Sequence, residues 1–208
     1  MMIKINKFIS TKGLEKLKQI LDKRRFSQNS TIPIVSKILK DVKKNKYKAV
    51  KKYEKKLSKN TIIKPSIREI NQSIKSLSPE IKKAIDYAYT RIFKYHSLQK
   101  IKNINYRDKF NNFIQYKSVP INKVGIYVPA NLPSTLLMNA IPAKIAGVKK
   151  IILANPRLNK QLNPAVIYAA KKLGINDIYS MGGAQAIGSL TYVQKVDKIV
   201  GTWKYLCS

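Results

Sequence analysis

Four short apolar runs, separated by stretches with helical spacing, occupy the last third of the chain. They lie at residues 124–128, 149–154, 176–181 and 196–200. Strands that alternate with helices of roughly ten or more residues form parallel βαβ units, because a parallel pair needs a long crossover connection. Ligands of such sheets bind outside the carboxyl ends of the strands. The pattern therefore predicts a parallel sheet whose functional loops lie at 127–129 and 181–185.

Helical spacing dominates the N-terminal half. Apolar residues recur every three or four positions over 32–57, with lysines opposite them and an interruption around 45–47. A shorter helix is predicted over 66–77. The Ser-Pro-Glu sequence at 78–80 gives a hydroxyl cap, a first-turn proline and an acid, so a helix is predicted from there to about Lys100. Four of its side chains are expected in the core: Ile81, Ile85, Ala88 and Ile92.

The helical spacing of apolar residues ends before residues 113–128, which are rich in β-branched and aromatic residues. Pro120 and Gly125 punctuate this stretch, so it predicts two strands around a turn. We therefore expect an α/β fold in two parts. Residues 1–123 form a mainly helical segment with some strands, and residues 124–208 form a parallel βαβ domain.

Turn and cap residues bound the helices of the second part. Ser134 or Thr135 is expected to cap a helix over 136–146, which Gly147 ends. Asn163 and the following proline are expected to open another helix, and a glycine at 174 to close it.

The charge balance of the chain is extreme. Its 208 residues include 42 basic and 10 acidic side chains, a formal net charge of +32. Only six of the basic residues are arginine, and the lysines are spread along the chain. Proteins that bind nucleic acid specifically usually carry arginine side chains, which can bind two phosphate oxygens at once, on a localised basic face. We interpret the charge as a compositional bias towards Lys, Ile and Asn, and expect no specific nucleic-acid partner, although polyanions should adhere nonspecifically.

Three features suggest the compartment. Cys207 is the single cysteine, which excludes an internal disulfide and fits reducing surroundings. The N-terminus has lysines but no apolar core typical of a signal peptide. No run approaches the roughly eighteen apolar residues of a membrane span, so we expect a cytoplasmic protein without a membrane partner.

Candidate catalytic and metal-binding groups are scarce. His96 is the single histidine and follows the apolar position Ile92 by four residues, so a structural role is the default. A structural zinc site needs about four Cys or His ligands and a catalytic one about three. Asp177 and Asp197 stand at strand starts, opposite the expected ligand edge. No base lies near Ser134 or Ser189, so we assign no catalytic and no metal residues.

A binding site remains. The Gly182-Gly183-Ala184-Gln185 sequence follows a strand and opens a helix expected over 184–190, an arrangement whose N–H groups suit an anion. Gln185 offers an amide to a polar ligand, and Tyr127 offers a ring and a hydroxyl. A helix start without any ligand explains the glycines equally well. The sequence is not the G-x-G-x-x-G dinucleotide fingerprint.

Taken together, these segments resemble histidinol dehydrogenase. The stretches that follow the family in order are VPINKVGIYVP, PSTLLMNAIPAKIAGVKKIILANP, NPAVIYAAKKLGINDIY, GGAQAIGSL and KVDKIVG. The N-terminal part resembles it more loosely, at 34–57 and in LSPEIKKAIDYAYTRIFKYHSLQK. The resemblance extends to Gly201 and covers about the first half of a family member.

The resemblance implies Rossmann-like α/β domains, an intertwined homodimer, and dependence on zinc and NAD. Such enzymes oxidise L-histidinol to L-histidine through the aldehyde, in two hydride transfers to NAD, as the last step of histidine biosynthesis. Tyr127 in GIYVP and Gln185 in GGAQ match the family's NAD-contacting tyrosine and glutamine. The family's catalytic Glu-His pair and its zinc ligands (Gln, His, Asp, His) fall in the other half.

The sequence departs from the family beside the expected nucleotide. The loop 127–130 is shorter than the family's, as is the turn at 192–193, and lost glycines remove permitted backbone conformations. The family's Gly-Pro-Gly-Asn, whose asparagine contacts NAD, is replaced by Gly-Thr-Trp-Lys at 201–204. As a hypothesis, one inserted adenine in codons for the former produces the latter. Sequencing the gene would test this, because the family sequence should continue in the shifted frame.

We therefore expect a truncated histidinol dehydrogenase, NAD-dependent by descent and inactive as this 208-residue chain. Without a metal for the substrate and a base for its proton, the reaction lacks its parts even if NAD binds. One alternative is a retained nucleotide-binding module, or a half-enzyme complemented by a separate C-terminal chain. Another is a basic polyanion-binding protein, whose complexes would then survive raised salt.

Overall fold

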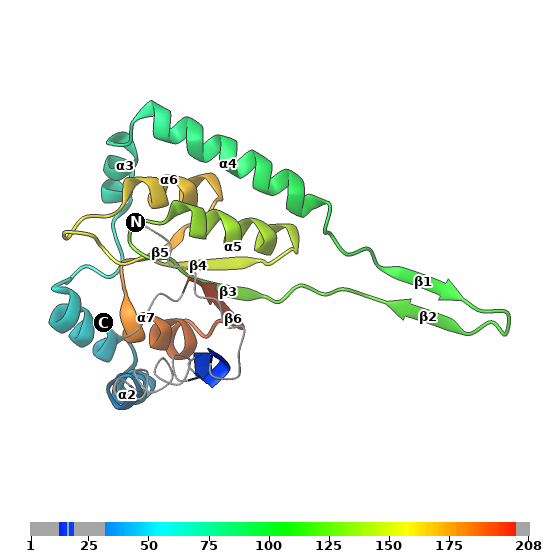
Figure 1. Ribbon diagram of the computed structural model, residues 1–208, viewed down its shortest axis with the longest axis horizontal. Helices are drawn as coiled ribbons and strands as arrows, with labels where there is room; N and C mark the ends of the chain where they lie inside the picture. The colour runs from blue at the N-terminus through cyan, green and yellow to red at the C-terminus, as the bar shows by residue number, and fades with distance from the viewer. Residues whose placement is uncertain (1–12, 16, 19–31, 203–208) are drawn as a thin grey trace.

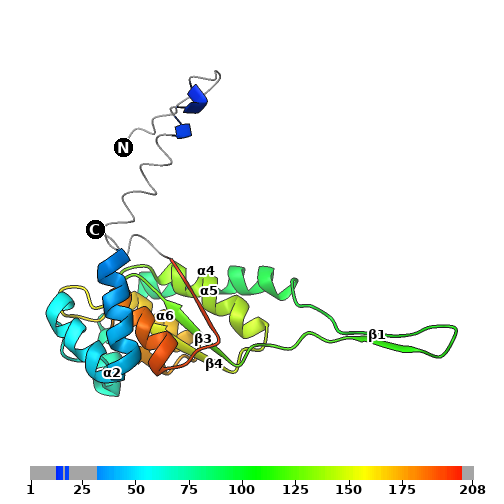
Figure 2. The ribbon, with the colours of Figure 1, turned by 90° about the horizontal axis from the view of Figure 1, so that it is seen from below.

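The computed structural model describes residues 13–15, 17–18 and 32–202, and its centre is a four-stranded sheet covered by helices on both faces (Figure 1). The strands are β1 (Ile104–Arg107), β2 (Phe113–Tyr116), β3 (Lys123–Tyr127), β4 (Lys150–Ala154), β5 (Asp177–Tyr179) and β6 (Lys198–Gly201). The helices are α2 (Ile32–Ser58), α3 (Ile67–Lys75), α4 (Pro79–Ser97), α5 (Pro133–Ile145), α6 (Pro164–Lys172), α7 (Gly183–Gly188) and the π-helical turn η1 (Ser189–Val193). Helices α3 to α6 pack on one face, while α2 lies beside α7 on the other (Figure 2).

The order of the sheet is β5-β4-β3-β6, and every pairing in it is parallel. The four apolar runs are these four strands, so the α/β fold predicted from the sequence is confirmed. From β3 the chain adds β4 and β5 in one direction, and β6 then returns to the other side of β3. Ligands of open α/β sheets bind where the order reverses in this way. In this protein that point is the carboxyl ends of β3 and β6, where Tyr127 pairs with Gly201.

Each face of the sheet has its own apolar cluster, because side chains alternate along a strand. In β4, Ile152 packs with residues of α2 and η1, whereas Leu153 packs with residues of α4, α5 and α6. Full burial of one such side chain stabilises the fold by about 1.5–3 kcal/mol. The two clusters therefore fix α2 and α7 on one side of the functional edge and the remaining helices on the other.

The N-terminal helices largely follow the predictions. Helix α2 breaks at Lys46 (φ 49°, ψ −131°), within the interruption expected at 45–47. Helix α4 starts after Ser78, whose side chain accepts a bond from Ile81 N–H, but it ends at Ser97, before Lys100. Ile81 is 46% exposed, so its predicted core position is wrong, whereas Ile85, one turn later on the same helix, is 5% exposed.

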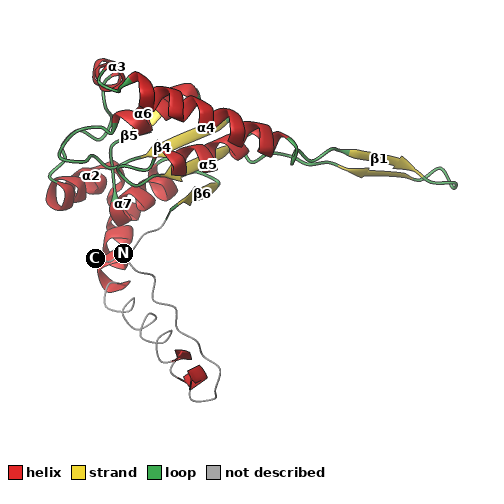
Figure 3. Cartoon of the chain, turned by 45° about the horizontal axis from the view of Figure 1, so that its top comes forward, coloured by secondary structure: helices red, strands yellow, loops and turns green. Residues whose placement is uncertain are grey.

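The prediction for 113–128 is correct about two strands and incomplete about their partners. Strand β3 joins the parallel sheet, whereas β2 pairs with β1, which the sequence did not reveal. The missed signal is turn chemistry: Asp108 Oδ1 accepts bonds from the N–H groups of Phe110 and Asn112. The resulting hairpin extends far from the helices and the sheet (Figure 3), and every residue of both its strands is exposed.

Helix α5 begins differently from the prediction. It starts at Pro133, so Ser134 and Thr135 lie inside its first turn and cap nothing, since proline is favoured at the first helical position. The Thr135 hydroxyl instead lies 3.1 Å from that of Thr202. The other expected ends are confirmed: Gly147 follows α5 with φ +89°, and Asn163 caps α6 by accepting bonds from two backbone N–H groups.

Candidate functional site

The two loops predicted to carry function lie together at the carboxyl edge of the sheet. Tyr127 is the last residue of β3, and Gln185 is the third residue of α7. Both are on the α2 side of the sheet: Tyr127 packs against the apolar cluster that contains Met181, Ala184 and Ala186, the neighbours of Gln185 in sequence. The structure therefore brings the two predicted NAD contacts to one face.

The Tyr127 phenol reaches from β3 to the turn that follows β5. An added Cβ at Gly182 would lie 2.9 Å from Pro156, so this glycine allows the turn to pack on that proline, while its distance to the Tyr127 hydroxyl, 4.0 Å, is an ordinary contact. Burial raises the pKa of Tyr127, a backbone hydrogen bond with Gly183 opposes the rise, and the Glu54 charge adds to it. The hydroxyl therefore stays protonated at neutral pH and can act as a donor or an acceptor.

Gln185 is buried, with 2% of its surface exposed, and its side-chain amide is held by one carboxylate. Its Nε2 donates to Glu54 Oε1 at 2.8 Å, and Gly182 N–H donates to the same oxygen at 2.8 Å. Glu54 itself is 1% exposed. Gln185 Oε1 has no hydrogen-bond partner within the described part of the chain. The amide thus has a fixed donor side and a free acceptor side.

The Gly-Gly turn has structural reasons of its own. Gly183 has φ +58°, a conformation that residues with a Cβ rarely adopt, and a Cβ there would lie 3.0 Å from Gln185 Oε1. Helix α7 begins at Gly183 and continues as η1 after Gly188, so it is shorter than the helix predicted over 184–190. The sequence predicts that N–H groups at this turn suit an anion. One of them, Gly182 N–H, donates to the carboxylate of the protein's own Glu54.

Glu54 is the functional residue that sequence reasoning missed. It is surrounded by lysines in the sequence, but it follows Val50 by four positions and therefore shares the buried face of α2. Leu57, assigned to that face from its spacing, is 57% exposed. An acid on an otherwise apolar stripe was the available signal.

Asn155, directly after β4, was also missed. It is 1% exposed, and its Nδ2 donates to the carbonyl oxygens of Val128 and Pro129, each at 3.0 Å. Its backbone N–H donates to the carbonyl of Tyr179. Asn155 therefore ties the loop after Tyr127 to the ends of β4 and β5.

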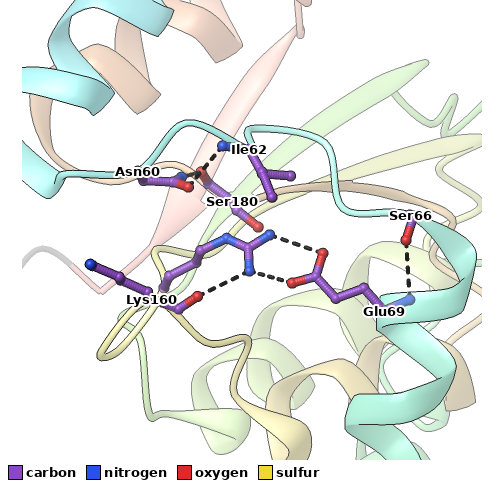
Figure 4. Close-up of polar contacts among 7 residues, drawn as sticks. Asn60, Ile62, Ser66, Glu69, Lys160 and Ser180 are labelled. Atoms are coloured by element: carbon purple, nitrogen blue, oxygen red, sulfur yellow. Dashed lines mark hydrogen bonds and ion pairs between the residues drawn. The ribbon is translucent and has the colours of Figure 1, made fainter.

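The segment after α2 crosses the end of β5 and holds that helix over the site. Asn60 Nδ2 donates to the carbonyl of Ser180 at 2.6 Å, and Ser180 N–H donates to the carbonyl of Ile63 at 2.6 Å. Further along the chain, the two terminal nitrogens of the Arg157 guanidinium donate to the two carboxylate oxygens of Glu69, and Arg157 Nη1 also donates to the Lys160 carbonyl (Figure 4). Two elements remote in sequence are thus joined next to the Gly-Gly turn.

The carboxyl end of β6 lies very close to that of β3. A Cβ at Gly201, which has φ +144°, would fall 2.0 Å from the carbonyl oxygen of Tyr127, so no other residue fits this backbone. The next residue, Thr202, contacts Thr135 of α5. Residues 203–208, which include Cys207 and most of the altered tail, lie outside the described residues.

The remaining ionisable candidates lie elsewhere. His96 is half-buried on α4, where its Nδ1 lies 2.6 Å from Gln99 Oε1. Asp177 pairs with Lys150 at 3.1 Å, and Asp197 accepts a bond from Lys123 N–H, both at strand starts as predicted. Within 13–15, 17–18 and 32–202, no three His, Cys, Asp or Glu side chains gather as a metal site would require. No helix in these ranges has the length and apolar character to cross a membrane.

Known proteins resemble this chain along most of its length. The profile of the family described as histidinol dehydrogenase matches residues 21–204. The histidinol dehydrogenase of Pelagibacter ubique is 53% identical over 192 residues, which are 89% of this chain and 45% of that protein. That of Methanococcus maripaludis is 36% identical over 95% of this chain and 49% of its own length.

A solved structure has the same fold. The crystal structure of histidinol dehydrogenase from Elizabethkingia anophelis superimposes with a TM-score of 0.78 at 36% identity, covering 84% of this chain and 42% of that one. This chain therefore spans about half the length of the relatives it matches.

Proposed function

Because the chain belongs to the histidinol dehydrogenase family, we propose that it forms the NAD-binding part of an enzyme that oxidises L-histidinol to L-histidine. The observation that carries this proposal is the meeting of Tyr127 and Gln185 on one face of the sheet, beside the point where the strand order reverses. Dinucleotides bind at such points in doubly wound sheets.

The residues present fit a nucleotide. The Tyr127 hydroxyl and ring border the carboxyl end of β3, and Gln185 Oε1 is a buried acceptor without a partner in the described ranges. NAD, when bound, supplies the hydride acceptor for the oxidation. The chain's own part is to hold and orient it, with Asn155 fixing the Tyr127 loop and Glu54 fixing the Gln185 amide.

The residues present do not fit zinc, the second requirement that the family resemblance implies. The 208-residue polypeptide has one histidine, which lies on α4 far along the chain from Tyr127 and Gln185. Zinc in catalytic sites takes about three protein ligands. We therefore propose that this polypeptide alone binds NAD without oxidising L-histidinol, and we derive no step through the metal.

Completion by another polypeptide is the second proposal, and the β1–β2 hairpin favours it. Its apolar side chains are exposed on both faces: Ile104 is 59%, Tyr106 56%, Phe113 59% and Ile114 56% exposed. An isolated two-stranded hairpin is marginally stable in water, and a large apolar patch marks an interaction site. The partner is a second protomer, as in the homodimers that the resemblance implies, or a chain supplying the C-terminal part.

Two measurements test these proposals. Calorimetric titration of NAD into the 208-residue polypeptide should show binding, and Gln185→Ala should weaken it about tenfold, the loss of one or two buried hydrogen bonds. In a mixture of the polypeptide with NAD, L-histidinol and zinc, reduction of NAD to NADH should be absent, and it should appear when a polypeptide with the family's C-terminal part is added. Turnover by the polypeptide alone would refute the proposed inactivity, and saturable NAD binding unaffected by Gln185→Ala would refute the site.

A further inference from the structure

We propose that Glu54 is a positioning residue, which orients the Gln185 carboxamide and the Gly-Gly turn (Gly182 and Gly183) for the nucleotide. The inference rests on the proposed NAD binding and adds a residue that does not itself touch NAD. Glu54 comes from α2, remote in sequence from the turn, and the two bonds that its side chain accepts come from Gly182 N–H in the turn and from Gln185 Nε2.

The geometry fixes which way the amide points. Gln185 Nε2 faces the Glu54 carboxylate, since the reverse orientation would set Gln185 Oε1 against a negative oxygen. Gln185 Oε1 is therefore left as the acceptor, beside Gly183. The ligand groups that suit it are hydroxyl or amide N–H donors, such as ribose or carboxamide groups. Glu54 thus sets the site's preference for a donor at this position.

Burial makes the arrangement strong. A carboxylate removed from water must be hydrogen-bonded, and bonds to a charged group contribute roughly twice as much as neutral ones. Within the described part of the chain, no Lys, Arg or His lies within ion-pair distance of Glu54, so the partners of its side chain are Gly182 N–H and Gln185 Nε2. The Asn60 and Ile63 contacts with Ser180 hold α2 in place beside them.

The test compares three variants. Glu54→Leu removes the acceptor at similar volume, whereas Glu54→Gln keeps one oxygen, and both donors already share one oxygen. Asp41→Leu is the matched control: it removes the same charge from the same helix, where Asp41 contacts Asn45 and Lys52 and not the turn. For each, NAD affinity is measured by calorimetry, and exchange of the Gln185 side-chain amide protons by NMR.

We expect Glu54→Leu to weaken NAD binding about tenfold and to speed exchange of the Gln185 amide. Glu54→Gln should restore affinity to within about threefold, and Asp41→Leu should lower the melting temperature with affinity unchanged. Wild-type affinity in Glu54→Leu would overturn the inference, as would an equal loss of affinity in Asp41→Leu. A wild-type polypeptide that protects the Gln185 amide but binds no NAD would support the contact and contradict the proposed function.

Discussion

Replacing Asn155 with alanine should both destabilise the fold and loosen the Tyr127 loop. The side chain donates two bonds, to the carbonyls of Val128 and Pro129, from a position that is 1% exposed. A hydrogen bond contributes about 0.5–1.5 kcal/mol net, so Asn155→Ala should lower the free energy of unfolding by about 2 kcal/mol. Removing the Asn155 Oδ1 atom, which has no partner in the described ranges, gives a small gain in return.

Chemical denaturation gives the free energy directly, and the melting temperature should fall by about 4–8 °C for a protein of this size. Asn105→Ala is the control, because its side-chain bond with Gln115 is exposed on the hairpin and should change stability by less than about 0.5 kcal/mol. NAD should bind more weakly to Asn155→Ala and normally to Asn105→Ala. Equal stability of the two variants would show that the Asn155 bonds do not hold the loop.

Three further predictions concern other parts of the molecule. Asp41 has a pKa lowered to about 2, chiefly by its bond from Asn45, so its stabilising effect is present above the unfolded pKa. The difference in unfolding free energy between wild type and Asp41→Asn should therefore shrink as the pH falls from about 4 to about 2; a constant difference would refute the assignment. Gly183→Ala should destabilise the fold by about 1 kcal/mol or more and weaken NAD binding, because φ is +58° there; an unchanged melting curve would contradict the strain argument. Ile114→Glu should abolish association with a partner chain, measured by light scattering, while leaving the melting temperature of the isolated chain unchanged because Ile114 is 56% exposed; persistent association would remove the hairpin from the interface.

The strands and most helix ends could be predicted because their causes are local. Apolar runs predict β3 to β6, and the break at Lys46 lies where the helical spacing of apolar residues is interrupted in the sequence. Ser78 and Asn163 cap helices by bonds to residues two or three positions on, and such spacing is visible in a sequence.

What could not be predicted depends on contacts between distant residues. Glu54 lies beside Gln185 only because α2 packs on α7, and the two residues are 131 positions apart in the sequence. Strand β1 alternates apolar Ile104 and Tyr106 with polar Asn105 and Arg107, but over only four residues, which is the shortest run at which such alternation indicates a strand. Ser134 or Thr135 is expected from the sequence to cap a helix because hydroxyl residues precede its apolar positions, whereas the actual partner of Thr135, Thr202, is remote in the sequence.

A second surface offers a competing place for a ligand. A groove of about 440 Å³ lies between α4 and α5, on the opposite face of the sheet from Tyr127 and Gln185. Tyr89 and Phe93 line it from α4, and Lys144 lines it from α5. Lys144 Nζ already donates to the Leu173 carbonyl, so the groove offers a ligand mainly aromatic and apolar contacts.

The most direct test of the central claim is an NMR titration of the isotope-labelled polypeptide with NAD. The account predicts saturable shifts in the amides of Gly182, Gly183 and Gly201, at the carboxyl edge of the sheet. Shifts confined to the groove between α4 and α5, or no saturable shifts at all, would contradict it.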